Sequence, residues 1–323
     1  LWARVALPFA LDHVNLYFVE DDGGLALIDT GVDNARTRAA FVALLDGPLA
    51  GRRLTRLIVT HHHPDHIGLA GWLCARHDLP LLTSQSAYLS AITLRDNPDR
   101  LGRGFYAAFY EQHGLTAGTA AAMSDWGERY RALVGPLPQR FTRLLAGDRL
   151  EIGGRSFAVM TADGHAPEQV MLHCAEAGLL FAADQVLPDI SPNISVWPTD
   201  PDSDPLGHYL RSLARIAADV PEDTLVLPGH RQPFFGLHGR IRALCAHHDD
   251  RLDTILAACA RPDLAAADRP STADLVPVLF ERPLEPNQFG FAFSETLAHV
   301  NHLLHLHRLV PAAGAGGRRY RCT

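Results

Sequence analysis

Lysine is absent from this chain of 323 residues, since all 29 of its basic residues are arginine. A catalytic lysine is therefore excluded. Long apolar runs are missing as well, because no stretch approaches the ~20 consecutive apolar residues that a membrane-spanning helix needs. The 36 acidic residues outnumber the basic ones and give a formal net charge of −7. We therefore expect neither a membrane nor nucleic acid as a partner.

Cysteine is scarce too. The five cysteines are scattered, odd in number and never arranged as C-x-x-C. This distribution favours reduced thiols over a disulfide framework. No signal peptide is visible, and together these features predict a cytoplasmic protein.

The apolar residues that are present suffice for a sizeable core, at 47% hydrophobic and 20% charged residues. Short β-rich runs gather in an early half and a later half of the chain, with helical spacing between and outside them. The expected strands are 14–20, 24–29, 54–60, 81–83, 149–152, 156–162, 169–173, 178–183 and 224–227. Two packed sheets with helices on their outer faces would bury these elements.

The segment LIVTHHHPDHIG, residues 57–68, places four histidines and an aspartate directly after an apolar run. Alternate residues that leave a strand point the same way, which suits His61 and His63 as a pair. Asp65 and His66 follow at the start of the next helix. Neutral imidazole suits zinc, and a carboxylate offsets the charge of the cation. Core packing gains nothing from adjacent imidazoles, so the segment predicts a metal site.

Three further candidate ligands stand at the ends of other expected strands. His165 lies in TADGHAPEQ, Asp184 ends the run LLFAAD, and His230 follows LVLPG. Two of the three follow a glycine, which permits the tight turn that brings a backbone close to a metal. Each alone would more often be an ordinary loop residue, but their order and spacing point to a shared site.

This order of motifs resembles the metallo-β-lactamase superfamily over residues 10 to 235. The resemblance implies an α/β fold, the four-layer αββα sandwich. It also implies that Asp29, in LIDTG, orients a ligand histidine from behind. The implied ligand set has two metals and one bridging carboxylate: His61, His63 and His165 at the first metal, Asp65, His66 and His230 at the second, and Asp184 between them.

Such a pair of cations, about 3.5–4 Å apart, lowers the pKa of a bridging water from about 15.7 towards 7 and so supplies hydroxide. One metal polarises the substrate carbonyl. Asp65 is the candidate to orient the nucleophile and then carry its proton to the leaving group. We expect two zinc ions per chain, with iron or manganese as alternatives. The expected reaction is hydrolysis of a small ester-like substrate, a thioester or a lactone.

Departures from particular branches of the family narrow this interpretation. True β-lactamases with H-x-H-x-D-H usually lack the bridging aspartate, which here is Asp184. The flavodiiron branch has glutamate where this chain has His63, which favours zinc. The chain is similar to the glyoxalase II-like branch, but the basic residues that grip glutathione near the C-terminus of those thioesterases find no match. Glutathione is therefore doubtful as part of the substrate.

Residues 1–235 are expected to form the catalytic domain and residues 236–323 a helical C-terminal domain. Helices at 236–260, 271–280 and 294–308, then two strands around a Gly-rich turn, are similar to the winged-helix appendix of some family members. Some of those relatives cleave RNA. The alternative function is therefore a phosphodiesterase or endoribonuclease whose wing binds nucleic acid.

A small basic cluster on this wing would carry that alternative: Arg318, Arg319 and Arg321. The acidic total and the lack of a sustained basic stripe favour instead a wing used for packing or for contacts in a homodimer.

A helical insertion at about 84–134 is rich in aromatic residues. These side chains either line an apolar substrate pocket or pack a helical lid: Phe105, Tyr106, Phe109 and Tyr110. If they face the metals, the substrate carries an acyl or other apolar part. PDISPNISVWP, residues 188–198, is a second candidate wall of such a pocket.

Other histidines are not expected to bind metal. His62 lies between two candidate ligands and should point the opposite way. The pair His247-His248 is expected at the surface. A late run has the spacing of one packed or solvated helix: His299, His302, His305 and His307.

Overall fold

The computed structural model describes residues 1–9, 11–97, 102–260, 269–312 and 317–323. The chain divides into two compact units whose segments interleave along the sequence. The first unit comprises Leu1–Pro98, Gly127–Pro192 and Leu213–Arg240, and the second comprises Asp99–Trp126, Asn193–Ser212 and Ile241–Thr323.

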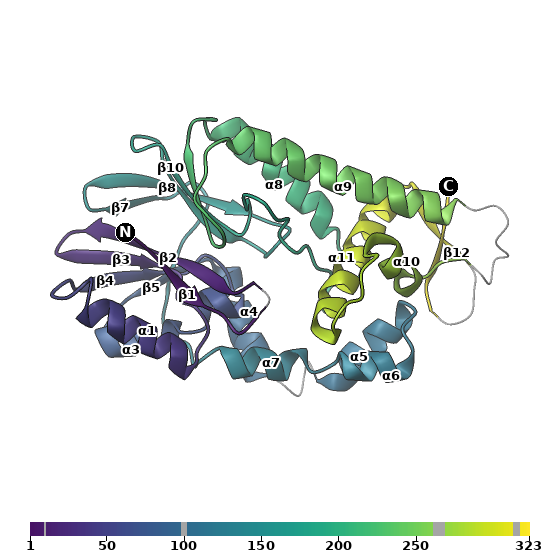
Figure 1. Cartoon of the computed structure of the whole chain (residues 1–323), viewed down its shortest axis with the longest axis horizontal. Coiled ribbons are helices and arrows are strands. Elements are labelled where there is room, and N and C mark those ends of the chain that lie inside the picture. Colours follow the sequence, from purple (N-terminus) through teal and green to yellow (C-terminus); the bar gives the residue numbers. More distant parts are fainter. Residues whose placement is uncertain (10, 98–101, 261–268, 313–316) are drawn as a thin grey trace. The chain divides into compact units, whose positions relative to one another are not determined.

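A six-stranded sheet opens the first unit (Figure 1). Its strands, in spatial order, are β1 (Trp2–Ala6), β2 (His13–Asp21), β3 (Gly24–Ile28), β4 (Leu54–Ile58), β5 (Leu81–Thr83) and β6 (Thr142–Arg143). The first three strands pair antiparallel, and β3 to β6 pair parallel. Neither edge strand, β1 or β6, had been expected from the sequence pattern.

The second sheet has five strands. In spatial order they are β11 (Leu225–Pro228), β10 (Leu179–Ala183), β9 (Gln169–Cys174), β8 (Arg155–Ala162) and β7 (Arg149–Ile152). Only β10 and β11 pair parallel. Because parallel neighbours end at the same edge of a sheet, the loops after β10 and β11 emerge side by side.

Two apolar clusters hold the layers of the first unit together. One lies between the sheets and joins side chains such as Ile58 and Phe157. The other covers the outer face of the six-stranded sheet, where Phe41 and Leu73 are buried. Four helices supply this cover: α1 (Ala35–Asp46), α3 (Ala70–His77), α4 (Gln85–Asp96) and α7 (Trp126–Leu133).

Parts of α8 (Pro205–Asp219) and α9 (Leu237–Cys259) that belong to the first unit lie beyond the second sheet (Figure 1). Arg215 of α8 donates to the carbonyl of Thr161 at the end of β8. The order helix, sheet, sheet, helix confirms the predicted αββα sandwich.

The second unit is mainly helical. It contains α5 (Arg103–Gln112), α6 (Ala117–Ala122), α10 (Thr272–Leu279), α11 (Pro286–His305) and the antiparallel strands β12 (Leu309–Ala312) and β13 (Arg319–Cys322). Helix α11 starts at residue 286, eight residues before the expected start, and its N-cap Glu285 forms a capping box with Gln288. The expected Gly-rich turn lies largely outside the described residues, and the winged helix stays a prediction.

Side chains expected at the surface of this unit are partly buried. His248 is fully buried, so its predicted exposure is wrong, and its Nδ1 lies 3.1 Å from Nε2 of His299.

Of the four aromatic residues singled out in the helical insertion, three are buried and only Phe105 is exposed. Tyr110 packs edge-on against Phe293 of α11. These contacts favour packing over a pocket lining.

None of the helices in the described ranges has both the length and the apolar character needed to cross a bilayer.

Candidate metal centre

The histidine segment follows the end of β4 in the first unit. His61 and His63 lie in the loop, and α2 (Pro64–Ile67) carries Asp65 and His66 in its first turn. Helix α2 ends at Ile67, and a second helix, α3, begins at Ala70. A Cβ at Gly68, between the two helices, would lie 2.3 Å from the carbonyl oxygen of Pro64.

The other three candidates come from the second sheet. His165 follows β8, Asp184 follows β10, and His230 follows β11. All three side chains are at most 8% exposed, as residues in a closed site are. The structure thus brings all seven predicted ligands to one edge of the sandwich.

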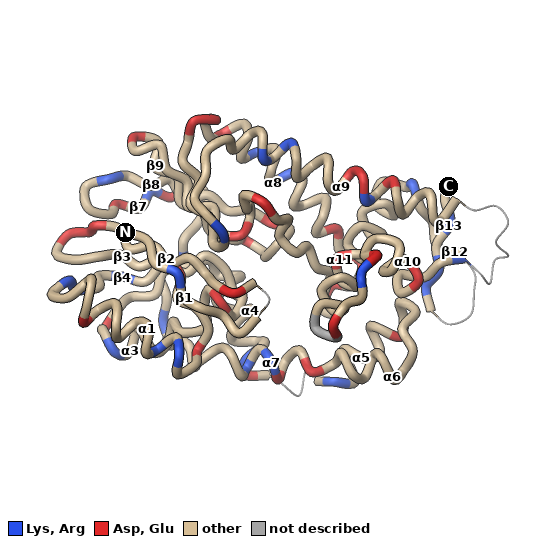
Figure 2. Tube along the Cα trace, in the orientation of Figure 1, with Lys and Arg blue, Asp and Glu red and all other residues tan. Residues whose placement is uncertain are grey.

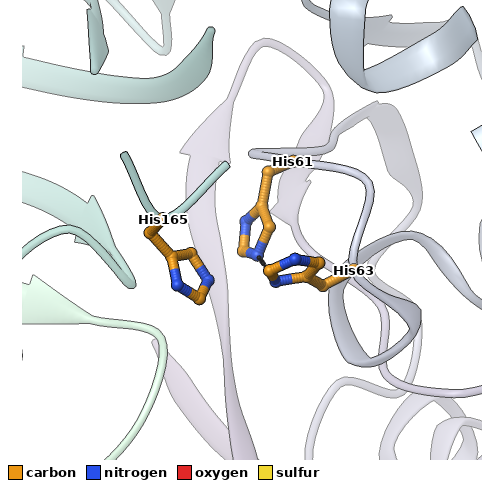
Figure 3. A group of neighbouring side chains, drawn as sticks. All are labelled: His61, His63 and His165. Carbon is orange, nitrogen blue, oxygen red and sulfur yellow. Dashed lines mark hydrogen bonds between the residues drawn. The ribbon is translucent and has the colours of Figure 1, made fainter. Parts of the chain in front are cut away.

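Three imidazoles form one half of the centre. Figure 3 shows His61, His63 and His165 converging from two separate loops. Nε2 of His61 lies 3.0 Å from Nδ1 of His63, and one ligand atom from each of the three residues lies within 4.8 Å of the others. Three nitrogens at this spacing form a group that could hold a metal ion.

Asp184 lies at the junction of the two halves. Its carboxylate oxygens are 3.4 Å from Nε2 of His66, 3.5 Å from Nε2 of His165 and 3.2 Å from Nε2 of His230. Asp65 closes the other half, with its Oδ2 3.3 Å from Nε2 of His230. Two further groups have ligand spacing: His61, His66 and Asp184, and Asp65, His66 and His230.

Asp29 orients the imidazole rings of His61 and His66 through their Nδ1 atoms. Its carboxylate accepts hydrogen bonds from the backbone N–H and hydroxyl of Thr60 and from Nδ1 of His66. Since the Thr60 hydroxyl donates its proton to Asp29, its oxygen accepts from Nδ1 of His61. Both rings therefore direct their Nε2 atoms toward the centre.

His230 is oriented by the backbone of β2. Its Nδ1 donates to the carbonyl of His13 at 2.7 Å, which again directs Nε2 toward the centre. The N–H of Arg231 donates to Nε2 of His13, and Arg231 has the left-handed φ of 68°. The chain is thus held in a strained conformation immediately after the candidate ligand.

The two halves differ in their electrostatics. Burial, together with the neighbouring rings, holds the pKa of His61 and of His63 well below the ordinary value, so both stay neutral. Burial opposes protonation of His230 as well, but Asp184 and Asp65 outweigh it and raise its pKa to about 10. The negative charges of Asp65 and Asp184 therefore lie at the second group of candidate ligands, and a cation bound there would neutralise them.

The donor set fits divalent cations. Nε2 of His66 and Oδ1 of Asp184 lie 3.4 Å apart, both are buried, and neither takes part in a hydrogen bond. Leaving buried polar atoms unpaired costs roughly 1–3 kcal/mol each. A shared cation would satisfy both, and imidazole nitrogen with carboxylate oxygen is a donor set that zinc, iron and manganese accept.

Sequence patterns did not reveal every residue that shapes this centre. Tyr130 of α7 donates its hydroxyl to the carbonyl of His62 at 2.6 Å and so fixes the loop between the candidate ligands. The sequence places Thr60 only at the end of an expected strand. His62 itself is buried, and its predicted orientation away from the candidate ligands stays a prediction.

Replacing Asp29 with asparagine is expected to weaken metal binding by about 10–100-fold, because an amide cannot accept all three of the hydrogen bonds made by the carboxylate. Competition with a chelator measures the affinity. Asp33→Asn, which removes an exposed ion pair with Arg38, is the matched control. Equal affinity in both variants would remove the orienting role of Asp29.

The chain is similar to known proteins over most of its length. Residues 10–230 match the family described as the metallo-beta-lactamase superfamily, and residues 252–323 match the metallo-beta-lactamase-like C-terminal domain. The crystal structure of a beta-lactamase domain protein from Burkholderia ambifaria covers 100% of this chain and 92% of its own, at 38% identity and a TM-score of 0.90.

Curated relatives agree with this likeness. The probable metallo-hydrolase YqjP of Bacillus subtilis is 26% identical over 92% of this chain and 90% of its own length. The hydroxyacylglutathione hydrolase of Cereibacter sphaeroides is 25% identical over 55% of this chain and 49% of its own length. The chain belongs to the metallo-beta-lactamase superfamily, with the C-terminal domain of that family, and is a metal-dependent hydrolase.

Proposed function

We propose that this chain is a dinuclear zinc hydrolase of a small ester-like substrate, a thioester or a lactone. The position of Asp184 between the two groups of candidate ligands is the observation that carries the proposal. His61, His63 and His165 would hold one ion, and Asp65, His66 and His230 the other, with Asp184 shared. Bound ions of this kind supply a water that ionises near neutral pH and a Lewis acid for the carbonyl oxygen.

Asp65 is the residue to which we assign proton transfer. Burial opposes ionisation of its carboxyl, but the charges of His66 and His230 outweigh burial and hold its pKa below the ordinary value. The side chain is 16% exposed, whereas His66 beside it is fully buried. An ionised, accessible carboxylate accepts a proton from attacking water and returns it to the leaving group.

A thioester or lactone fits this chain better than a phosphodiester. The hydroxyacylglutathione hydrolase among its relatives acts, by its name, on an acyl-glutathione. Two of the three basic residues of the expected wing already have acidic partners: Arg318 pairs with Asp202, and Arg319 lies 3.6 Å from Asp274. Acidic and basic residues are interspersed along the described trace (Figure 2). Phosphate binding needs uncommitted basic side chains.

Activity measurements on a panel of acyl thioesters, lactones and phosphodiesters test the proposal. We expect about two zinc ions per chain by elemental analysis, turnover of a thioester or lactone, and loss of turnover in His61→Ala. Full activity after chelation, with no metal detected, would contradict the mechanism. An RNA gel-shift repeated at several salt concentrations tests the alternative, since a steep salt dependence would favour nucleic acid.

A further inference from the structure

The second unit contains a cavity of about 510 Å³ that none of the candidate metal ligands lines. One wall is a single stripe of α9, and the other is the end of α10 with the loop after it. The lining residues are His247, Asp250, Arg251, Thr254, Val278, Leu279, Phe280, Glu281 and Arg282. A volume of this size is in the range of small-molecule sites, and the cavity is widely open to solvent.

A buried ion pair lies at the wall of this cavity. Nη1 of Arg251 is 3.3 Å from Oε1 of Glu295 in α11, and the two side chains are 19% and 10% exposed. Both atoms are buried and neither forms a hydrogen bond of good geometry. A buried pair joined by one long contact is poorly compensated for the loss of water. The stability of the fold therefore does not explain why this ion pair is buried.

Glu295 does not fully balance the positive charge of Arg251. Burial raises the pKa of Glu295 to about 7, against the opposing effect of Arg251, so its carboxyl is only partly ionised at neutral pH. Arg251 also stacks on Phe280, with its guanidinium carbon 4.6 Å from the ring centroid. Stacking fixes the plane of the guanidinium and leaves its edge available for a planar anion.

We propose that this cavity binds a small monocarboxylate with an apolar body. The geometry points to Arg251 and Arg282 as the residues that hold the carboxylate, and to Phe280 and Leu279 as the surface for the apolar part. Planar carboxylates pair bidentately with arginine. The proposal concerns the second unit alone and does not depend on the reaction at the metal centre.

The remaining charges in the cavity limit the ligand to one negative charge. Asp250 and Glu281 line the same cavity and are exposed to solvent. Two carboxylates repel a doubly charged phosphate more strongly than a carboxylate. The apolar lining includes Val278, which is 37% exposed. A hydrated inorganic anion gains nothing from that surface, whereas an aryl or alkyl carboxylate buries it.

Isothermal titration of the metal-loaded chain with phenylacetate tests the site. Phenylacetamide, its neutral isostere, is expected to bind at least about tenfold more weakly, because it loses the charge-assisted hydrogen bonds. Arg282→Gln is expected to weaken phenylacetate binding by about tenfold. Arg242→Gln is the matched control, since Arg242 is an exposed arginine of α9 outside the lining.

A second pair of variants separates a lost ligand contact from a lost fold. Thr254→Trp fills the cavity from an exposed helical position and should abolish binding, while Thr254→Ala should retain it. His61→Ala should also retain it, which distinguishes this cavity from the metal centre. Absence of binding to the wild-type chain, undiminished binding to Thr254→Trp, or loss of binding in His61→Ala would each overturn the proposal.

Discussion

Replacing Asp184 with asparagine is expected to lower kcat/KM by about 10³-fold, more than the 10–100-fold typical of a residue that acts only through a ligand. Asp184 contacts the Nε2 atoms of His66, His165 and His230 within 3.5 Å. An amide keeps the size of the side chain but removes its negative charge and turns one oxygen into a donor. The NH2 group of the amide would point toward the position where a cation would bind.

Steady-state kinetics and elemental analysis together check this expectation. The variant should bind less metal. It should keep the wild-type circular dichroism spectrum, because asparagine has the same shape as aspartate. Asp46→Asn, at the exposed end of α1, is the control and should change kcat/KM by less than about twofold. Wild-type metal content with wild-type activity in Asp184→Asn would show that the carboxylate is not shared.

Sequence patterns predicted the αββα sandwich because strands and helices carry their own periodicity. In β8, the buried residues Phe157 and Val159 alternate with less buried neighbours, and this alternation identifies the buried face without tertiary information. Ile58 lies instead in a continuous apolar run, which is typical of a strand buried on both faces. The two edge strands of the six-stranded sheet, β1 and β6, escaped prediction. β6 has only two residues, Thr142 and Arg143, both exposed, so its strand character comes entirely from pairing with β5.

The seven candidate ligands were also predicted, because their residue types have few other uses at the ends of strands. Residues that position them were harder to find. Thr60 and Tyr130 act through a hydroxyl whose partner is set only by the folded chain. The carbonyl of His13, which accepts from His230, carries no side-chain signal at all.

The second unit shows the limit of local reasoning most clearly. His248 reads as a surface residue because its neighbours in sequence are polar, yet it is fully buried beside His299 and Tyr209. Three helices distant in sequence create that environment. Likewise, the cavity beside Arg251 depends on how α9 meets the loop after α10, which no periodicity encodes.

Replacing Gly229 with alanine is expected to disrupt the metal centre although residue 229 has no ligand atom. An added Cβ would lie 2.2 Å from Oδ1 of Asp184 and 2.9 Å from Cε1 of His66. The backbone cannot retreat, because its N–H donates to the carbonyl of Ala183 and its carbonyl accepts from the N–H of Asn15. Asp184 and His66 must therefore move. We expect a loss of metal affinity of at least about tenfold and a cost of about 1–3 kcal/mol in stability.

Chelator competition and thermal unfolding measure these two effects. Gly104→Ala is the matched control, since a Cβ there meets no heavy atom within 4 Å, and the substitution lies in α5. It should be neutral or stabilise the chain by up to about 1 kcal/mol, because alanine favours a helix over glycine. Sequence reasoning expected the glycine before His230 to supply a tight turn. The contacts assign it a different task, which is to leave room: wild-type metal affinity in Gly229→Ala would mean that the carboxylate of Asp184 does not lie against this backbone.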